Sequence, residues 1–370
     1  MVAVSATYPS TSYSNLATSL ASVLSAATTG SSAATTTAST EPAATAITLS
    51  SAAQAAMAVK DFATVLSDTK AKLAVLLKES GLTTPLKDGK VAVDLSGLDQ
   101  RELFAMASDD SFSADEQAAA GIEMQRRFEN AMSGPAGVAQ VTGNFTALYK
   151  AAATYLDSLG PEEKAGDDWI AGRAAITEGL KQLQTDPKTL PDTSEEDPVQ
   201  LYLALVNAGA AQQQQDIKDV AKSARQSLDT LYVDAIAAGK APTFNKKTIT
   251  GTYIDMSGFS SRTLSAIALN TGDQFSSTEV DEAKAALRSK SGAALLAGFK
   301  DAAKSSDPTA FSQNIISIYA SMSAEERQAA GWSDQFYAAA VQSYESTSKL
   351  TQMFAEAGGD ATGFMSWMGK

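Results

Sequence analysis

The sequence predicts a mainly α-helical protein made of two tandem copies of one helical module, each with a short β-hairpin or strand, preceded by a disordered N-terminal tail. Three observations support this fold class. The N-terminal residues carry almost no charge, the rest of the chain has apolar residues at helical spacing, and one pattern of residues recurs about 160 positions further on.

The N-terminal tail is predicted from composition. Residues 1–58 are dominated by Ser, Thr and Ala and carry one charged side chain, Glu41. Because such a segment buries too little apolar surface to offset the entropy lost on ordering, we expect residues 1–54 to be disordered. One helical face is present, formed by Leu16, Leu20, Val23 and Leu24. Two interpretations stay open: a transient helix in a flexible tail, or an uncleaved export or docking segment that folds against a partner.

The same tail resembles a class of exported proteins. Its low charge and Ser/Thr/Ala bias resemble the N-termini of substrates of bacterial flagellar and related type III export systems, and residues 47–54 (ITLSSAAQ) resemble linkers in flagellum-associated proteins. The first basic residue is Lys60 and no unbroken apolar stretch precedes it, so a Sec signal peptide is not expected. The resemblance implies a protein that is secreted or held at the cell surface through an uncleaved segment; a cytoplasmic location is the alternative.

The duplication is predicted from matching residues in matching order. The sequence VDLSGL at 93–98 corresponds to IDMSGF at 254–259. Further matches follow in the same order, among them Arg101 with Arg262 and Trp169 with Trp332. A repeat this long indicates duplicated domains, because solenoid repeats are about 20–50 residues long.

This pattern divides the chain into four parts. After the tail we expect the first copy at 55–187, a linker at 188–197, and the second copy at 198–370, which ends in a tail rich in Met and aromatic residues. The region of the linker is rich in Pro, Asp, Thr and Glu, which is typical of a stiff and solvated connection.

Within each copy the spacing of apolar residues predicts the elements in order. Helical stripes run over 59–77 and 217–236, and Gly81 and Gly239 stand where these helices are expected to end. The other expected elements are β-like runs at 90–95 and 248–256, short helices at 98–107 and 259–268, and helices at about 114–132, 140–158, 162–184, 277–303, 308–321 and 333–357.

Composition excludes several kinds of chemistry. The chain has neither Cys nor His, which rules out thiolate and imidazole ligands, cysteine nucleophiles and Ser-His-Asp triads. The net charge of −13 disfavours a nucleic-acid partner. Because the apolar stretches are short, we expect no membrane-spanning helix.

Two matching loops are the candidate metal sites. The first offers Asp109, Asp110 and Glu116, and the second offers Asn270, Asp273 and Glu279. Both resemble the second half of an EF-hand calcium loop, yet they are degenerate, because alanines occupy positions where calcium needs an oxygen ligand. No cofactor is therefore expected, with calcium kept as the open possibility.

The same loops have a structural interpretation that needs no metal. A Ser followed three residues later by Glu is the pattern of a capping box, in which both side chains satisfy N–H groups at a helix start. This pattern occurs at Ser113/Glu116, Ser276/Glu279 and Ser323/Glu326. The matching pairs Asp94/Arg101 and Asp255/Arg262 similarly indicate an ion pair or cap that fixes a strand-to-helix turn.

Together these patterns favour a non-enzymatic role. We expect an exported structural, adaptor or surface-associated binding protein that contacts a protein partner through its N-terminal segment or its C-terminal tail, where residues 363–368 are rich in Met and aromatics. The first alternative is a calcium-binding protein with EF-hand-like loops. The second is a glycan hydrolase that uses carboxylates alone, which requires two facing carboxylates in a groove.

Overall fold

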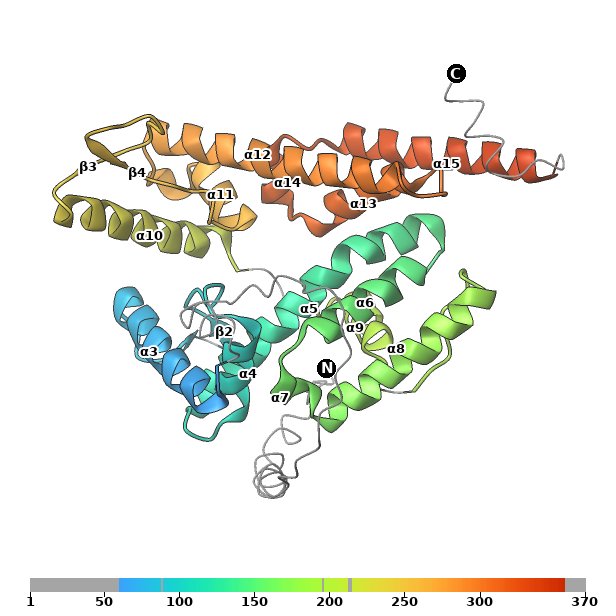
Figure 1. Ribbon diagram of the computed structural model, residues 1–370, viewed down its shortest axis with the longest axis horizontal. Helices are drawn as coiled ribbons and strands as arrows, with labels where there is room; N and C mark the ends of the chain where they lie inside the picture. Colours follow the sequence, from blue (N-terminus) through green and yellow to red (C-terminus); the bar gives the residue numbers. More distant parts are fainter. Residues whose placement is uncertain (1–59, 88, 195, 212–214, 357–370) are drawn as a thin grey trace, which may run out of the picture. The chain divides into compact units, whose positions relative to one another are not determined.

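The computed structural model describes residues 60–87, 89–194, 196–211 and 215–356, and it confirms a mainly helical chain (Figure 1). The predicted disordered tail and the C-terminal residues 363–368 lie outside the described residues. Every helix in the described part of the chain is too short or too polar to cross a lipid bilayer.

Contacts divide the chain into two compact units. The first unit comprises the described residues up to Lys90 together with Leu95–Gly121, and the second comprises Val91–Asp94 together with the described residues from Ile122 onward. This division falls within a helix, α5 (Ala114–Thr142), whereas the predicted linker at 188–197 connects α8 to α9.

The first unit is built around two packed helices. Helix α3 (Phe62–Ser80) ends at Gly81, whose φ of 65° is the left-handed conformation that favours glycine. The strands β1 (Leu86–Lys87) and β2 (Lys90–Val91) follow. Helix α4 (Gln100–Ser108) then packs against α3. The fully buried side chains of this unit include Leu73, Leu98, Leu103 and Met106.

Helices α5 to α9 form the first core of the second unit. Helices α6 (Thr146–Ser158), α7 (Pro161–Lys164) and α8 (Asp167–Thr185) follow α5, and α9 (Pro198–Asn207) packs on α6 and α8. The buried Tyr149 donates a hydrogen bond of 2.7 Å from its hydroxyl to Asp197 Oδ2. Asp197 also caps α9, so one carboxylate holds the start of α9 against α6.

The elements in the rest of the second unit follow an order similar to that of α3 to α8. It contains α10 (Ile217–Ala237), β3 (Ala241–Thr243), β4 (Gly251–Tyr253), α11 (Ser261–Ala268) and the short 3₁₀ helix η2 (Thr271–Asp273), followed by α12 (Ser277–Ala302), α13 (Ala310–Ser321), α14 (Ala324–Ala330) and α15 (Asp334–Glu356). Helix α13 packs against both α12 and α15. Figure 1 shows these three long helices running along one another, with α15 extending past the start of α13.

Of the expected β-hairpin or strand, short strands are present after α10, but β3 and β4 do not pair as a hairpin. Strands β3 and β4 run parallel, with Ala241 opposite Gly251 and Thr243 opposite Tyr253. The chain between them turns back on itself, and Thr248 Oγ1 accepts a bond of 2.9 Å from the Gly251 N–H. A Cβ at Gly251 would lie 2.7 Å from the carbonyl oxygen of Ala241, so this close parallel pairing needs a glycine.

The two helices expected at 114–132 and 140–158 also differ from the structure. Helix α5 continues through Pro135 to Thr142. Packing against α13 supports this stretch, because a Cβ built on Gly137 would lie 2.3 Å from the Ala320 side chain. Close contact between helices thus outweighs the local preference of Pro to end one.

The two halves share hydrogen bonds at corresponding positions. Leu98 N–H donates to Leu95 O at 3.0 Å, and Phe259 N–H donates to Met256 O at 3.1 Å. Further along, a turn precedes both α6 and α13. The turn before α6 contains Asn144 N–H to Thr142 Oγ1 (3.0 Å) and Thr146 N–H to Asn144 Oδ1 (2.9 Å). The turn before α13 contains Asp307 N–H to Ser305 Oγ (3.0 Å) and Thr309 N–H to Asp307 Oδ1 (2.8 Å).

Candidate functional site

The first candidate loop lies between α4 and α5. Asp109 ends α4, and its Oδ1 accepts a hydrogen bond of 2.9 Å from the Ser111 N–H. Glu116 Oε2 accepts bonds from the N–H and the hydroxyl of Ser113 at 2.7 and 2.9 Å, and the Ser113 hydroxyl accepts a longer bond from the Glu116 N–H. These two side chains therefore make the reciprocal bonds of a capping box.

The second candidate loop lies between α11 and α12 and has a tighter backbone. Asn270 and Asp273 have φ values of 48° and 54°, in the left-handed region that residues other than glycine rarely adopt. Asn270 Oδ1 accepts a bond of 2.9 Å from the Phe275 N–H, which closes the loop. Ser276 and Glu279 then form a capping box at the start of α12. Ser323 and Glu326 form another at the start of α14, so the capping predicted from sequence is confirmed.

Glu279 has a second role that the capping pattern does not predict. Its side chain is 4% exposed, and Oε1 accepts hydrogen bonds from Arg225 at 2.8 Å and from the Tyr232 hydroxyl at 2.6 Å. Burial disfavours the charged carboxylate, but the hydrogen bonds from Tyr232, the Ser276 N–H and Arg225 outweigh it and hold the pKa of Glu279 below its ordinary value. Glu279 therefore links α10 to the start of α12.

Arg225 also contacts an aromatic ring, and a similar contact is present in the first unit. Its guanidinium lies 5.7 Å from the centre of the Phe275 ring. In the first unit Lys70 lies 5.4 Å from the ring of Phe112, which is the sequence counterpart of Phe275. A cation on the long helix thus faces an aromatic ring at the head of the capping loop in both halves.

These contacts occupy oxygen atoms that the loops would need to coordinate calcium. Calcium takes six to eight oxygen ligands, and both oxygens of Glu279 already accept hydrogen bonds from protein groups. Within the described residues, Asp and Glu side chains do not gather in any group of three or more that could hold a metal ion. The donor set therefore fits helix capping better than calcium coordination, and the two loops belong to different compact units.

The matching arginines bind backbone carbonyl groups. Arg101 Nη1 donates to Lys60 O at 2.6 Å, and Arg262 Nε donates to Gln215 O at 3.1 Å. Each acceptor lies directly before the residue that caps a long helix, Asp61 for α3 and Asp216 for α10. The arginines therefore fix the start of α3 or α10 against the short helix that follows the strands.

Arg262 and the aspartate before it also make contacts of their own. Arg262 reaches Ser323 Oγ at 3.0 Å and Glu325 at 3.9 Å. Asp255 Oδ1 accepts a bond of 2.8 Å from the Ser257 N–H, and this bond lowers the pKa of Asp255. Asp255 thus caps the turn before α11, as expected.

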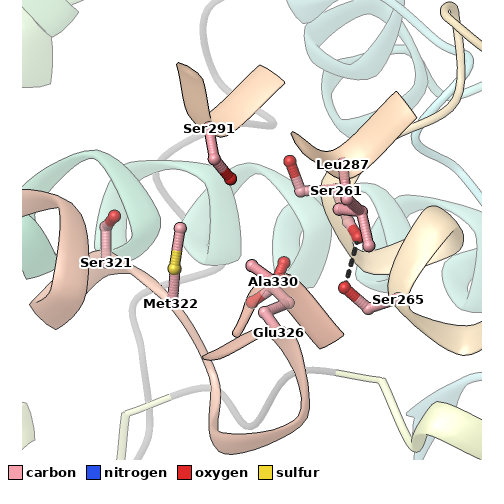
Figure 2. A pocket seen from close by; sticks show the side chains of 8 residues that line it. All are labelled: Ser261, Ser265, Leu287, Ser291, Ser321, Met322, Glu326 and Ala330. Atoms are coloured by element: carbon pink, nitrogen blue, oxygen red, sulfur yellow. Dashed lines mark hydrogen bonds between the residues drawn. The ribbon is translucent and has the colours of Figure 1, made fainter. Parts of the chain in front are cut away.

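The second unit contains a small cavity. Its volume is about 190 Å³. Figure 2 shows it between α11, α12 and the α13–α14 turn, lined by Ser261, Ser265, Leu287, Ser291, Ser321, Met322, Glu326 and Ala330. The Ser265 hydroxyl donates to Ser261 O at 2.7 Å, and Glu326 Oε2 accepts from the Ser323 N–H at 2.8 Å. One carboxylate lines this cavity, whereas acid–base hydrolysis of a glycan requires two.

Comparisons with known proteins add no assignment. A scan against protein-family models and searches of curated proteins and of solved structures found no match to this chain. The functional argument therefore rests on the contacts described above.

Proposed function

We propose that residues 55–187 and 198–370 are two copies of one helical module. The support is a set of interactions that recur at corresponding places: the arginine on a backbone carbonyl group, the cation facing an aromatic ring, and the turn before α6 and α13. Burial recurs as well, since Val93 and Ile254 are each 2% exposed. Matching bonds at corresponding places of the two segments support a common origin.

On this basis we propose a non-enzymatic structural, adaptor or surface-associated binding protein. The proposal rests on one observation, namely that the recurring charged side chains contact groups of the protein's own backbone. Arg101 and Arg262 bind backbone carbonyl groups, and Glu116 and Glu279 close helix caps. Residues kept in both copies thus maintain the shape of the module, which is what a scaffold requires. Two modules on one chain also allow bivalent contact with partners.

We further propose that residues 1–54 direct export from a bacterial cell without cleavage and contact a protein partner. This part of the proposal rests on the composition of the segment and places the protein outside the cell or at its surface.

Export is tested in the native host by comparing the intact chain with a variant that lacks residues 1–54. We expect the truncated chain to stay inside the cell while circular dichroism of the purified protein still shows folded helices. Glu326→Gln is the matched control, because Gln preserves the capping box, and this variant should be exported normally. Normal export of the truncated chain would contradict the role of the tail.

The non-enzymatic assignment has its own test. Purified intact chain and Glu326→Gln are incubated with bacterial cell-wall polysaccharide, and released reducing ends are measured. We expect no release from either protein. Release by the intact chain that disappears in Glu326→Gln would contradict the proposal and favour a carboxylate hydrolase.

A further inference from the structure

The second module has an exposed apolar face at one end. We define the C-terminal apolar face as Leu296, Phe299 and Phe311, which are 54%, 58% and 37% exposed; Leu296 and Phe299 are neighbours one turn apart on α12. The rings of Phe299 on α12 and Phe311 on α13 lie 5.8 Å apart at 89°, so two helices contribute to one aromatic contact. Exposed apolar side chains that gather in this way indicate a surface that another segment covers.

The surroundings of α6 show what occupies the corresponding place in the first half of the chain. The turn bonds relate α6 to α13 by 163 positions, since Thr146 corresponds to Thr309. By the same offset Leu148 corresponds to Phe311, yet Leu148 is 0% exposed. Leu148 lies in one core cluster with Val199 and Tyr202 of α9, the helix that follows α8.

The chain after α15 is suited to the same task. Helix α8 ends at Thr185, which corresponds to Ser348 by the same offset, whereas α15 continues to Glu356. The added turns carry the exposed apolar residues Leu350 and Met353. Residues 357–370 follow and contain Phe364, Met365, Trp367 and Met368.

The length of this segment is sufficient. Ser312 Oγ and Ser343 Oγ lie 3.0 Å apart, so Ser343 marks the level of the start of α13. Glu356 is thirteen residues further along α15, or roughly 20 Å at 1.5 Å per residue. The eight residues from Glu356 to Phe364 span up to about 26–29 Å when extended, enough to return to Phe311.

We propose that residues 363–368 dock on the C-terminal apolar face of their own chain, in the place that α9 occupies beside α6. This inference rests on the proposed duplication and goes beyond the proposed function. It assigns the C-terminal segment to the module itself and leaves the N-terminal segment as the contact for a partner.

The absence of cysteine makes a direct test simple. A nitroxide is attached to Ser366→Cys in the otherwise intact chain, and its mobility is read by electron paramagnetic resonance. We expect an immobilised spectrum that becomes mobile when Phe299→Ser is added. Val233→Ser is the matched control, because Val233 is an exposed apolar residue of α10 (63%) and its loss should leave the label immobilised.

Each result decides for or against docking. A mobile label in the parent chain, or a label unaffected by Phe299→Ser, would overturn the proposal. Immobilisation that disappears on hundredfold dilution would also overturn it, because a second copy of the chain would then be the occupant. Should Phe299→Ser lose its helical signal, Leu296→Ser replaces it. None of these results bears on the duplication, which a superposition of the two modules tests separately.

Discussion

Replacing Glu279 by Gln is the sharpest test of the link between α10 and α12. Gln keeps a side-chain oxygen for the Ser276 N–H, so the capping box is preserved. The charge is lost from a carboxylate that accepts bonds from Arg225 and Tyr232 at 2.8 and 2.6 Å. Hydrogen bonds to a charged group contribute about 1.5–3 kcal/mol, and breaking a buried ion pair costs about 3–5 kcal/mol.

The contacts of Arg225 place the expected loss of stability at the lower end of these values. Arg225 is 21% exposed and keeps an ion pair of 2.8 Å with Asp229, so its charge is not left unpaired. We expect Glu279→Gln to lower the free energy of unfolding of the second unit by about 2–3 kcal/mol. For a unit of this size that corresponds to a fall in Tm of about 4–12 °C.

Glu116→Gln is the matched control, because Glu116 forms the corresponding capping box and its bonds are to Ser113. We expect this variant to change stability by less than about 0.5 kcal/mol. Urea unfolding is followed by far-UV circular dichroism and by tryptophan fluorescence, which reports on the second unit because Trp169 and Trp332 both lie there. Equal losses in the two variants, or no loss in Glu279→Gln, would refute the assigned role.

Three further outcomes are expected. Gly298→Ala should destabilise the chain by about 1–3 kcal/mol, because the added Cβ would lie 1.9 Å from Asn314 Oδ1. On the same helix, the Cβ added by Gly292→Ala meets no atom within 4 Å, so this variant should be neutral or stabilising by up to about 1 kcal/mol. Urea midpoints that rank the two variants the other way would contradict the packing. Tm should be the same in millimolar calcium and in EDTA, and a rise with calcium would show that the loops bind it. The pKa of Glu279 is lowered in the folded protein, so its contribution to the free energy of unfolding is present above its unfolded pKa near 4.5 and is lost as the pH falls below that value. Glu279→Gln should therefore lose less stability than the parent chain between pH 5 and pH 3. An unchanged dependence of stability on pH would count against this role of Glu279.

Local patterns in the sequence predict much of this fold. Helical stripes locate α3 and α10, and the capping boxes at Ser276/Glu279 and Ser323/Glu326 are confirmed, because both depend on residues close together in the chain. The parallel pairing of β3 and β4 could not be predicted, since it depends on a turn whose direction is set by Gly251 and Thr248.

Contacts between distant residues account for the remaining differences. Helix α5 passes through Pro135 because glycines allow α13 to approach, which no single-helix pattern shows. The partners of Glu279 were likewise missed, because Arg225 lies 54 residues away in the sequence. The nearest local parallel is that Lys70 on α3 and Arg225 on α10 each face an aromatic ring.

A crystal structure of the intact chain tests the central claim, that two copies of one module form a scaffold, most directly. The measurement is the superposition of the backbone of 142–159 on 305–322, together with the contacts of the two arginines. We predict that the segments superpose throughout and that Arg101 and Arg262 each donate to the carbonyl group preceding the cap of α3 or α10. Segments that diverge after the first turn, or arginines with unrelated partners, would contradict the duplication.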